Sequence, residues 1–197
     1  MKTFSLITLL FSSLLTFSQK TWTEKDKKVL TENFLRTKAE INEETKNLTD
    51  KQWTFKEDAS KWSIAQVVEH LYNWSLITQQ NVRYSIQLGE NPALAAKSLS
   101  DSSVTTFIWE ERPHKSPDHT IPTGLITGDN NRKIFNAKYD EIIAFIEKSD
   151  LNFRNFLRSF GDEYQEDLFQ QFTIHYGHVD RHLRQIKRIK NHTNFPQ

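Results

Sequence analysis

Three histidines occupy one short stretch near the C-terminal end of the chain. His175, His178 and His182 stand at positions i, i+3 and i+7, and about 3.6 residues complete a helical turn, so their rings share one face of a helix. Apolar residues such as Val179 and Ile186 continue the same three- and four-residue steps. The face is therefore that of a core-facing helix, and the histidines interrupt it.

Histidines on a core-facing stripe need partners. A side chain that titrates near neutrality and faces a core must be hydrogen-bonded, paired or bound to a metal ion. His70 has the same character, because it lies in line with Val67, Trp74 and Ile77 on an earlier helical stripe. Imidazole sets bind zinc, nickel, copper or iron. His70 together with two of the later histidines predicts a divalent-metal site in a helical core.

Spacing alone leaves the pair on the later helix open, since 175/178, 178/182 and 175/182 could each turn two rings toward one point. An i, i+4 pair is the commonest two-point grip along a helix, which favours His178 and His182. Gln185 is placed to orient His182 from behind, although a plain surface glutamine is equally compatible with the pattern. Three protein ligands would leave a position for water or substrate, whereas a fourth would make the site structural. A bundle whose histidines only hydrogen-bond across the core is a third interpretation.

Four helical segments would position these residues. The pattern predicts helices over residues 23–46, 63–88, 129–149 and about 162–190, and the first two open with the capping pairs Thr23/Asp26 and Ser63/Gln66. Residues 91–128 hold four prolines and read as a long loop draped on the domain. No strand-like alternation is apparent. The predicted fold is all-α, a four-helix bundle with a long crossover between helices two and three.

The N-terminus predicts export. Lys2, an apolar run over residues 4–15 and the small residues Thr16 and Ser18 are typical of a cleaved secretory signal over residues 1–18. The run falls short of the roughly 20 residues that span a bilayer, and no later stretch approaches that length. We therefore expect a periplasmic or secreted protein with a single domain over residues 19–197 and no stable membrane association after cleavage.

Composition excludes several classes of function. The chain has no cysteine, which rules out disulfides and thiolate ligands. Lys and Arg number 26 against 25 for Asp and Glu, so no nucleic-acid partner is expected. Val179 stands where a metalloprotease HExxH motif would need its glutamate, and GxSxG, P-loop and GxGxxG motifs are absent. A small-molecule substrate is the expected partner, and a homodimer is also compatible with the sequence.

Two stretches are similar to the signatures of the DinB-like superfamily. Residues 62–70, WSIAQVVEH, look like the WSxxxxxxH start of the second helix in that superfamily, and residues 178–186, HVDRHLRQI, resemble its HxxRHxxQI signature. The proline-spaced segment at residues 113–124 is similar to its crossover, and the likeness extends over residues 25–190. The superfamily groups metal-dependent hydrolases and includes the bacillithiol S-transferases.

The resemblance implies an up-down-down-up bundle that holds a divalent metal, usually zinc or nickel, through His70, His178 and His182. It leaves His175 as a pocket-lining or core residue. From the sequence, however, His175 is the nearest candidate for a catalytic general base, one turn from His178.

The function expected from the resemblance is that of a metal-dependent hydrolase acting on a small molecule. Low-molecular-weight thiols are cytosolic, so the export signal weighs against thiol transfer. A thiol S-transferase-like enzyme and a non-catalytic metal- or ligand-binding bundle remain the alternatives.

Overall fold

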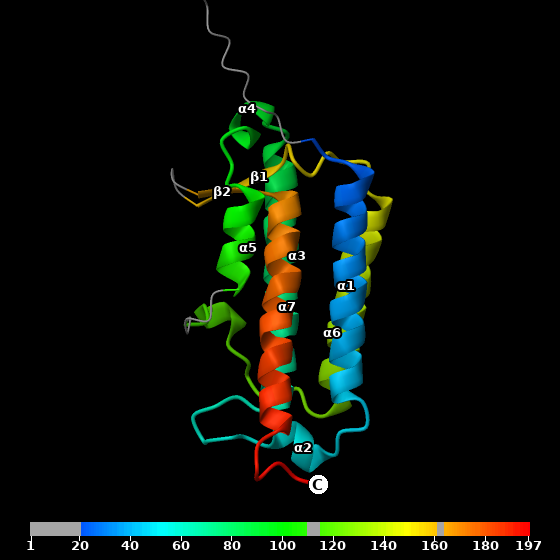
Figure 1. Ribbon diagram of the computed structural model, residues 1–197, viewed down its shortest axis with the longest axis vertical. Helices are drawn as coiled ribbons and strands as arrows, with labels where there is room; N and C mark the ends of the chain where they lie inside the picture. Colours follow the sequence, from blue (N-terminus) through cyan, green and yellow to red (C-terminus); the bar gives the residue numbers. More distant parts are fainter. Residues whose placement is uncertain (1–20, 110–114, 161–163) are drawn as a thin grey trace, which may run out of the picture.

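The computed structural model describes residues 21–109, 115–160 and 164–197 (Figure 1), so the predicted signal peptide over residues 1–18 lies outside the described residues. Four long helices dominate it, namely α1 (Glu24–Thr45), α3 (Ile64–Leu88), α6 (Asp129–Lys148) and α7 (Leu168–Lys190). The shorter helical elements are α2 (Asp50–Thr54), α4 (Pro92–Ala95), α5 (Asp101–Trp109) and the 3-10 helix η1 (Asp118–Thr120). The predicted four-helix bundle is confirmed. None of the helices in these ranges is both long and apolar enough to cross a membrane.

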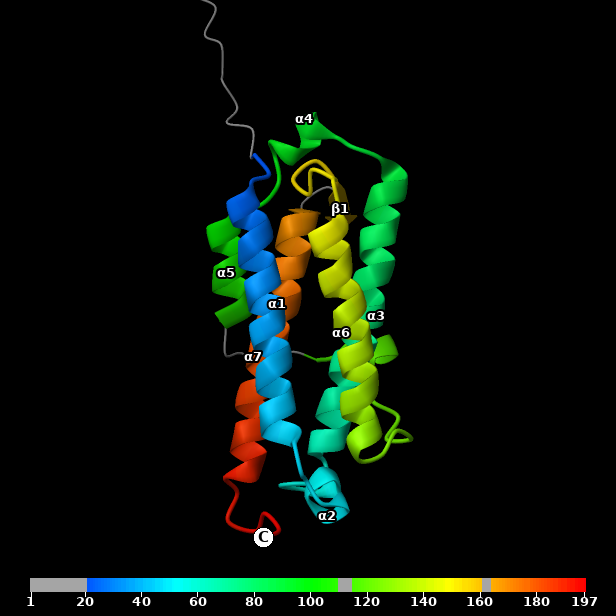
Figure 2. The same cartoon turned by 90° about the vertical axis from the view of Figure 1, so that its right-hand side faces the viewer.

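Each long helix packs against two others. α1 and α3 both contact α6 and α7, so α1 lies diagonally across the bundle from α3, and α6 lies diagonally across from α7. Two perpendicular views show that α1 and α7 run in one direction and that α3 and α6 run in the other (Figures 1 and 2). The two helices that carry the candidate ligands, α3 and α7, are therefore antiparallel neighbours.

Aromatic side chains fill the space between α1, α6 and α7. Phe34, Phe135, Tyr139 and Phe172 are all fully buried or nearly so. The ring centroid of Phe34 lies 5.2 Å from that of Tyr139 and 5.9 Å from that of Phe172. Burial of such large rings is the main stabilising contribution in a bundle of this size. This packing holds α7 against α1, and α7 also contacts α3.

Capping boxes define where three of the long helices begin. The side chains of Thr23 and Ser63 accept hydrogen bonds from the third residue of α1 and α3, and Asp26 and Gln66 reciprocate. Both boxes confirm the predictions from the sequence. A third box, formed by Asp167 and Gln170, opens α7. Each box satisfies backbone N–H groups that the helix leaves without partners.

A short hairpin stands where the start of the fourth helix was predicted. Strand β1 (Leu157–Phe160) pairs antiparallel with β2 (Tyr164–Asp167), and Leu157 lies opposite Asp167. Helix α7 therefore begins at Leu168 rather than near residue 162, and the prediction that the chain has no strands was wrong. Four-residue strands are too short to show an alternating pattern, and these are supported by contacts with α3 and α7.

The crossover contains a helix rather than only a loop. Helix α5 packs along α7 and buries Val104 and Ile108, which a helix places one turn apart on the same side. The approach is close because Gly177 of α7 has no side chain. A methyl group there would lie 2.8 Å from Cγ1 and from Cδ1 of Ile108.

A buried arginine ties the crossover to the bundle. The Arg154 side chain is 5% exposed and donates hydrogen bonds to Asp101 at 3.0 Å, Asp167 at 3.1 Å and Asp26 at 3.3 Å. These carboxylates stand at the starts of α5, α7 and α1. A buried charge is tolerated only when hydrogen-bonded partners compensate its lost hydration, so this network fixes where α5 begins relative to α7.

The contact at Gly177 predicts strong coupling between α5 and α7. In the wild-type background, Gly177→Ala should lower the free energy of unfolding by about 1–2 kcal/mol, because overpacking outweighs the better helix propensity of alanine. In an Ile108→Ala background the clash is absent, and the same change should raise it by up to about 1 kcal/mol. Urea unfolding of the four proteins measures both effects. Equal effects in the two backgrounds would show that α5 does not rest on Gly177.

Candidate metal centre

His70 projects from α3 toward α7 and is almost completely buried, with 1% of its surface exposed. Its Nδ1 lies 2.8 Å from the carbonyl oxygen of Thr120. A carbonyl can only accept, so Nδ1–H donates and Nε2 carries the lone pair in the neutral ring. Burial lowers the pKa of His70, and the bond to Thr120 opposes this only in part. The ring therefore presents an unprotonated Nε2 to the interior at neutral pH.

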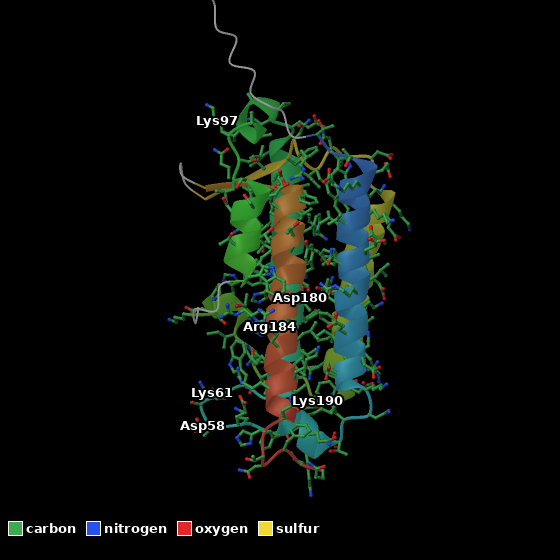
Figure 3. All side chains as sticks on the ribbon, in the orientation of Figure 1. Asp58, Lys61, Lys97, Asp180, Arg184 and Lys190 are labelled. Carbon is green, nitrogen blue, oxygen red and sulfur yellow. The ribbon has the colours of Figure 1, made fainter. Side chains whose placement is uncertain are left out.

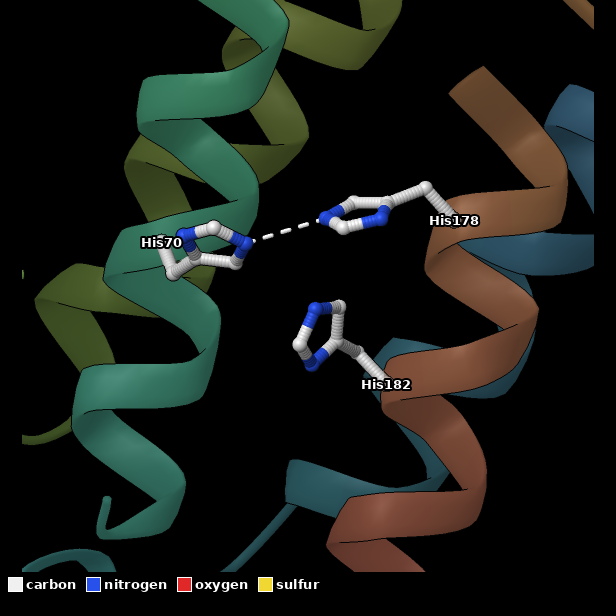
Figure 4. A group of neighbouring side chains, drawn as sticks. All are labelled: His70, His178 and His182. Atoms are coloured by element: carbon white, nitrogen blue, oxygen red, sulfur yellow. Dashed lines mark hydrogen bonds between the residues drawn. The ribbon is translucent and has the colours of Figure 1, made fainter. Parts of the chain in front are cut away.

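His178 and His182 face His70 from successive turns of α7. Figure 4 shows the three rings directed toward one another across the α3–α7 interface. The Nε2 atoms of His70 and His178 are 3.0 Å apart, and one ligand nitrogen from each of the three rings lies within 4.8 Å of the others. The structure thus brings together His70, His178 and His182, as the sequence and the family resemblance predicted.

The orientation of His182 is set by a neighbour on its own helix. Gln185 Oε1 accepts a hydrogen bond from His182 Nδ1 at 2.8 Å, which is the role that the spacing allowed for this glutamine. Burial, together with the nearby ring of His70, lowers the pKa of His182 to about 3. Burial also holds the pKa of His178 well below its ordinary value. All three rings are consequently neutral, which is the form that binds metals.

The donor set fits a divalent ion. Ligand bonds of about 2.0–2.1 Å in tetrahedral geometry place neighbouring nitrogens roughly 3.3 Å apart, close to the 3.0 Å between the Nε2 atoms of His70 and His178. The other ligand nitrogens lie within 4.8 Å of one another, so the rings would have to draw closer around an ion. In the described part of the chain, no fourth histidine, aspartate or glutamate joins this group. Three protein nitrogens with an open position are the pattern of a catalytic rather than a structural zinc-type site.

Two tryptophans flank the histidines. Trp74 stacks on His178 with the ring centroids 4.4 Å apart, and Trp62 lies 4.9 Å from His70 and 6.5 Å from His182. Aromatic walls lower the local dielectric and strengthen electrostatic interactions inside the group. His178 is partly exposed, whereas His70 and His182 are buried.

Glu69, which sequence reasoning missed, connects the histidine group to the crossover. It is 2% exposed and accepts hydrogen bonds from the Thr123 backbone at 2.8 Å, the Thr123 hydroxyl at 2.6 Å and the Gly124 backbone at 2.8 Å. The neighbouring His70 is bonded to Thr120 of the same segment. Glu69 and His70, which are adjacent in α3, thus form hydrogen bonds to both ends of residues 120–124. The sequence does contain a signal for Glu69, because this acidic residue directly precedes the core-facing His70.

His175 lies outside this group, in the core. It is fully buried, and its ring stacks parallel to Phe34 at 5.4 Å between centroids. Its Nδ1 is 2.9 Å from the hydroxyl of Thr78, and its Nε2 is 3.4 Å from that of Ser75. Burial lowers the pKa of His175 to about 3. The catalytic role assigned to His175 from the sequence stays a prediction, and the geometry favours a packing role that links α7 to α3.

A separate hollow of about 600 Å³ lies on the outer side of α3, where Arg83, Tyr84, His119 and Arg158 are among the lining residues. None of the three clustered histidines lines it. The hollow is therefore separate from the three-histidine group.

The sequence of this chain matches a known protein superfamily. Residues 33–186 match the model of the DinB superfamily. The chain belongs to this superfamily. The match runs from α1 into α7 and includes His70, His178 and His182, so the resemblance seen in the two sequence signatures is confirmed.

Individual relatives agree with this assignment. The chain is 25% identical over 160 residues to the uncharacterized protein YuaE of Bacillus subtilis (strain 168), covering 80% of this chain and 94% of that protein. Among solved structures it is similar to YfiT from Bacillus subtilis, with a TM-score of 0.55, 13% identity, and coverage of 88% of this chain and 91% of that one. YfiT is described as a probable metal-dependent hydrolase with an unusual four-helix bundle topology. At this identity the likeness shows the fold alone.

Replacing the Glu69 carboxylate should loosen residues 120–124. Glu69→Gln turns an amide N–H₂ toward donors that need an acceptor, so we expect a loss of about 2 kcal/mol in the free energy of unfolding. We also expect faster hydrogen exchange at the Thr123 and Gly124 amides. The matched control is Glu32→Gln, because the Glu32 side chain is 63% exposed. Unchanged hydrogen exchange at both amides in Glu69→Gln would show that the Glu69 carboxylate does not hold residues 120–124 in place.

Acidification should destabilise the metal-free protein through His175. In the folded state His175 stays neutral down to about pH 3, whereas its ordinary pKa is 6.5. Between these values the unfolded chain binds the proton and the folded chain does not, so stability falls as the pH falls, by about 1.4 kcal/mol per pH unit for this residue. Urea unfolding at pH 7, 5 and 4 should show a shallower pH dependence in His175→Gln than in wild type. The same pH dependence of the unfolding free energy in both proteins would contradict this prediction.

Proposed function

We propose that this chain is an exported enzyme that hydrolyses a small molecule with one divalent metal ion held by His70, His178 and His182. The observation that carries the proposal is the convergence of three neutral imidazoles from two helices, with the His70 and His178 Nε2 atoms 3.0 Å apart. Zinc and nickel are the metals we favour from the family resemblance. The description of YfiT as a probable metal-dependent hydrolase supports the same reading.

Hydrogen bonds within the chain orient two of the three proposed ligands. A bound divalent ion would supply a Lewis acid and lower the pKa of a coordinated water toward neutrality. The Thr120 carbonyl and Gln185 hold the protons of His70 and His182 on Nδ1, so that Nε2 is available as the ligand atom. Trp62 and Trp74 pack against the rings of His70 and His178. The proposal gives His175 a packing role, because both its nitrogens face α3 hydroxyls.

The number of protein ligands favours an enzyme over a protein that only binds metal. A structural site would close the coordination sphere with a fourth side chain, and the described residues bring only three histidines together. Hydrolysis rather than thiol transfer is favoured by the proposed export, because low-molecular-weight thiols are cytosolic. The features of residues 1–18 support that export.

Metal content tests the proposal directly. Purified wild-type protein should hold about one divalent ion per chain by elemental analysis, and His70→Ala, His178→Ala and His182→Ala should each weaken binding by about 100-fold or more in calorimetric titration. His119→Ala is the control, since His119 is exposed on η1. A screen of esters and amides should show hydrolysis that chelation abolishes. Protein without stoichiometric metal after zinc and nickel loading would overturn the proposal.

A further inference from the structure

The proton on the candidate ligand His70 is directed at the crossover. His70 Nδ1–H donates to the carbonyl oxygen of Thr120 at 2.8 Å, and Thr120 is fully buried. The hydrogen bond that a neutral imidazole makes decides which of its two nitrogens carries the proton. His70 therefore offers its Nε2 to an ion as long as the Thr120 carbonyl keeps its position.

The turn that carries this carbonyl is shaped by bonds within the crossover. The backbone N–H and the hydroxyl of Thr120 donate to the carbonyl oxygen of Pro117 at 2.9 and 2.8 Å. Two residues after Thr120, the ring of Pro122 restricts the backbone further. These constraints are local to the crossover, so they shape the turn without fixing its distance from α3.

Glu69 supplies a contact that ties this turn to α3. Glu69 is 2% exposed, and its two carboxylate oxygens accept the backbone N–H groups of Thr123 and Gly124, each at 2.8 Å. Hydrogen bonds to an ionised acceptor are about twice as strong as neutral ones. Because Glu69 immediately precedes His70 in α3, the two ends of residues 120–124 are bonded to adjacent residues of one rigid helix.

The other acidic residue close to a candidate ligand has a different partner. Asp180 stands two residues from both His178 and His182, on the middle part of α7 (Figure 3). Both oxygens of Asp180 accept hydrogen bonds from Arg36 of α1 at 2.8 Å. Within two positions of the three histidines, Glu69 is therefore the acidic residue whose hydrogen bonds lead back to a candidate ligand.

We infer that Glu69 is a positioning residue of the metal centre, which fixes the proton of His70 and thereby sets the metal affinity. The path runs from the Glu69 carboxylate, along the backbone of residues 120–124, to the Thr120 carbonyl and His70 Nδ1. The inference deepens the proposed function and rests on metal binding by the three histidines. Partners that orient metal-ligating histidines typically change the affinity about 10- to 100-fold, so the crossover would control how tightly the ion is retained.

The tautomer of His70 in the metal-free protein tests the inference without an ion. Long-range ¹H–¹⁵N spectra of the imidazoles in the full chain should show His70 protonated on Nδ1. Glu69→Gln keeps the size of the side chain but replaces one acceptor oxygen by an amide N–H₂, so the population of the Nε2–H form should rise at least about twofold. Asp101→Asn makes the same change at a carboxylate bonded to Arg154 and should leave this tautomer unaltered.

Metal affinity provides the second measurement. Titration with Co²⁺, followed in the visible spectrum, should give an affinity about tenfold lower in Glu69→Gln than in wild type, and within about twofold of wild type in Asp101→Asn. The control also loses hydrogen bonds to a carboxylate, so it separates the orientation of His70 from a general loss of stability. An unchanged His70 tautomer or Co²⁺ affinity in Glu69→Gln, or equal losses of affinity in both variants, would overturn the inference.

A third measurement uses only the wild-type protein. Coupling between two sites is reciprocal, so a bound ion must stabilise residues 120–124 if these residues set its affinity. Zinc should slow hydrogen exchange at the Thr123 and Gly124 amides at least about fivefold, and should not affect the Asn91 amide, which bonds to the Asn155 carbonyl beyond the C-terminal end of α3. Equal exchange at Thr123 and Gly124 with and without bound zinc would overturn the inference. Failure of the wild-type protein to bind Co²⁺ or Zn²⁺ would instead overturn the proposed function, so the two failures are distinguishable.

Discussion

The candidate centre of this protein depends on keeping three imidazoles uncharged at one buried point between two helices. Three protonated rings at these distances would repel one another strongly in a medium of low dielectric. Burial removes that risk by lowering the pKa of each ring, to about 3 for His182. The same burial would be costly for unpartnered polar nitrogens. The arrangement is therefore stable only if each ring finds a hydrogen bond or a cation, and this requirement shapes the surrounding structure.

The crossover segment meets part of the requirement from outside the bundle. Thr120 supplies the acceptor that fixes the His70 proton, and Glu69 holds the rest of the segment through Thr123 and Gly124. A loop carries the functional contact, but it is placed by a rigid helix, as is common at binding sites. The long link between α3 and α6 is thus part of the centre rather than only a connection.

Helix α7 is also held by ion pairs to α1 and by hydrogen bonds to α3 outside the three-histidine group. Asp180 pairs with Arg36 at 2.8 Å, and Lys190 pairs with Glu44 at 2.7 Å, both across to α1. His175 bonds to α3 hydroxyls one turn before the metal group begins. Exposed ion pairs contribute little to stability individually, but here they lie beside an aromatic core and fix the rotation of α7. That rotation decides which histidines of α7 meet His70.

The sequence by itself determined the features that depend on neighbouring residues. Helical periodicity placed His178 and His182 on one face, and the capping pairs at Thr23 and Ser63 marked where α1 and α3 begin, because caps and periodicity act within one or two turns.

Only the tertiary structure decided the features that depend on distant partners. The hairpin before α7, the helix α5 over Gly177 and the separation of His175 from the metal group all arise from contacts between segments far apart in the chain. Even the protonated nitrogen of His70 is chosen by a carbonyl fifty residues away. Packing that closes long loops selects among conformations that local sequence leaves nearly equal in energy.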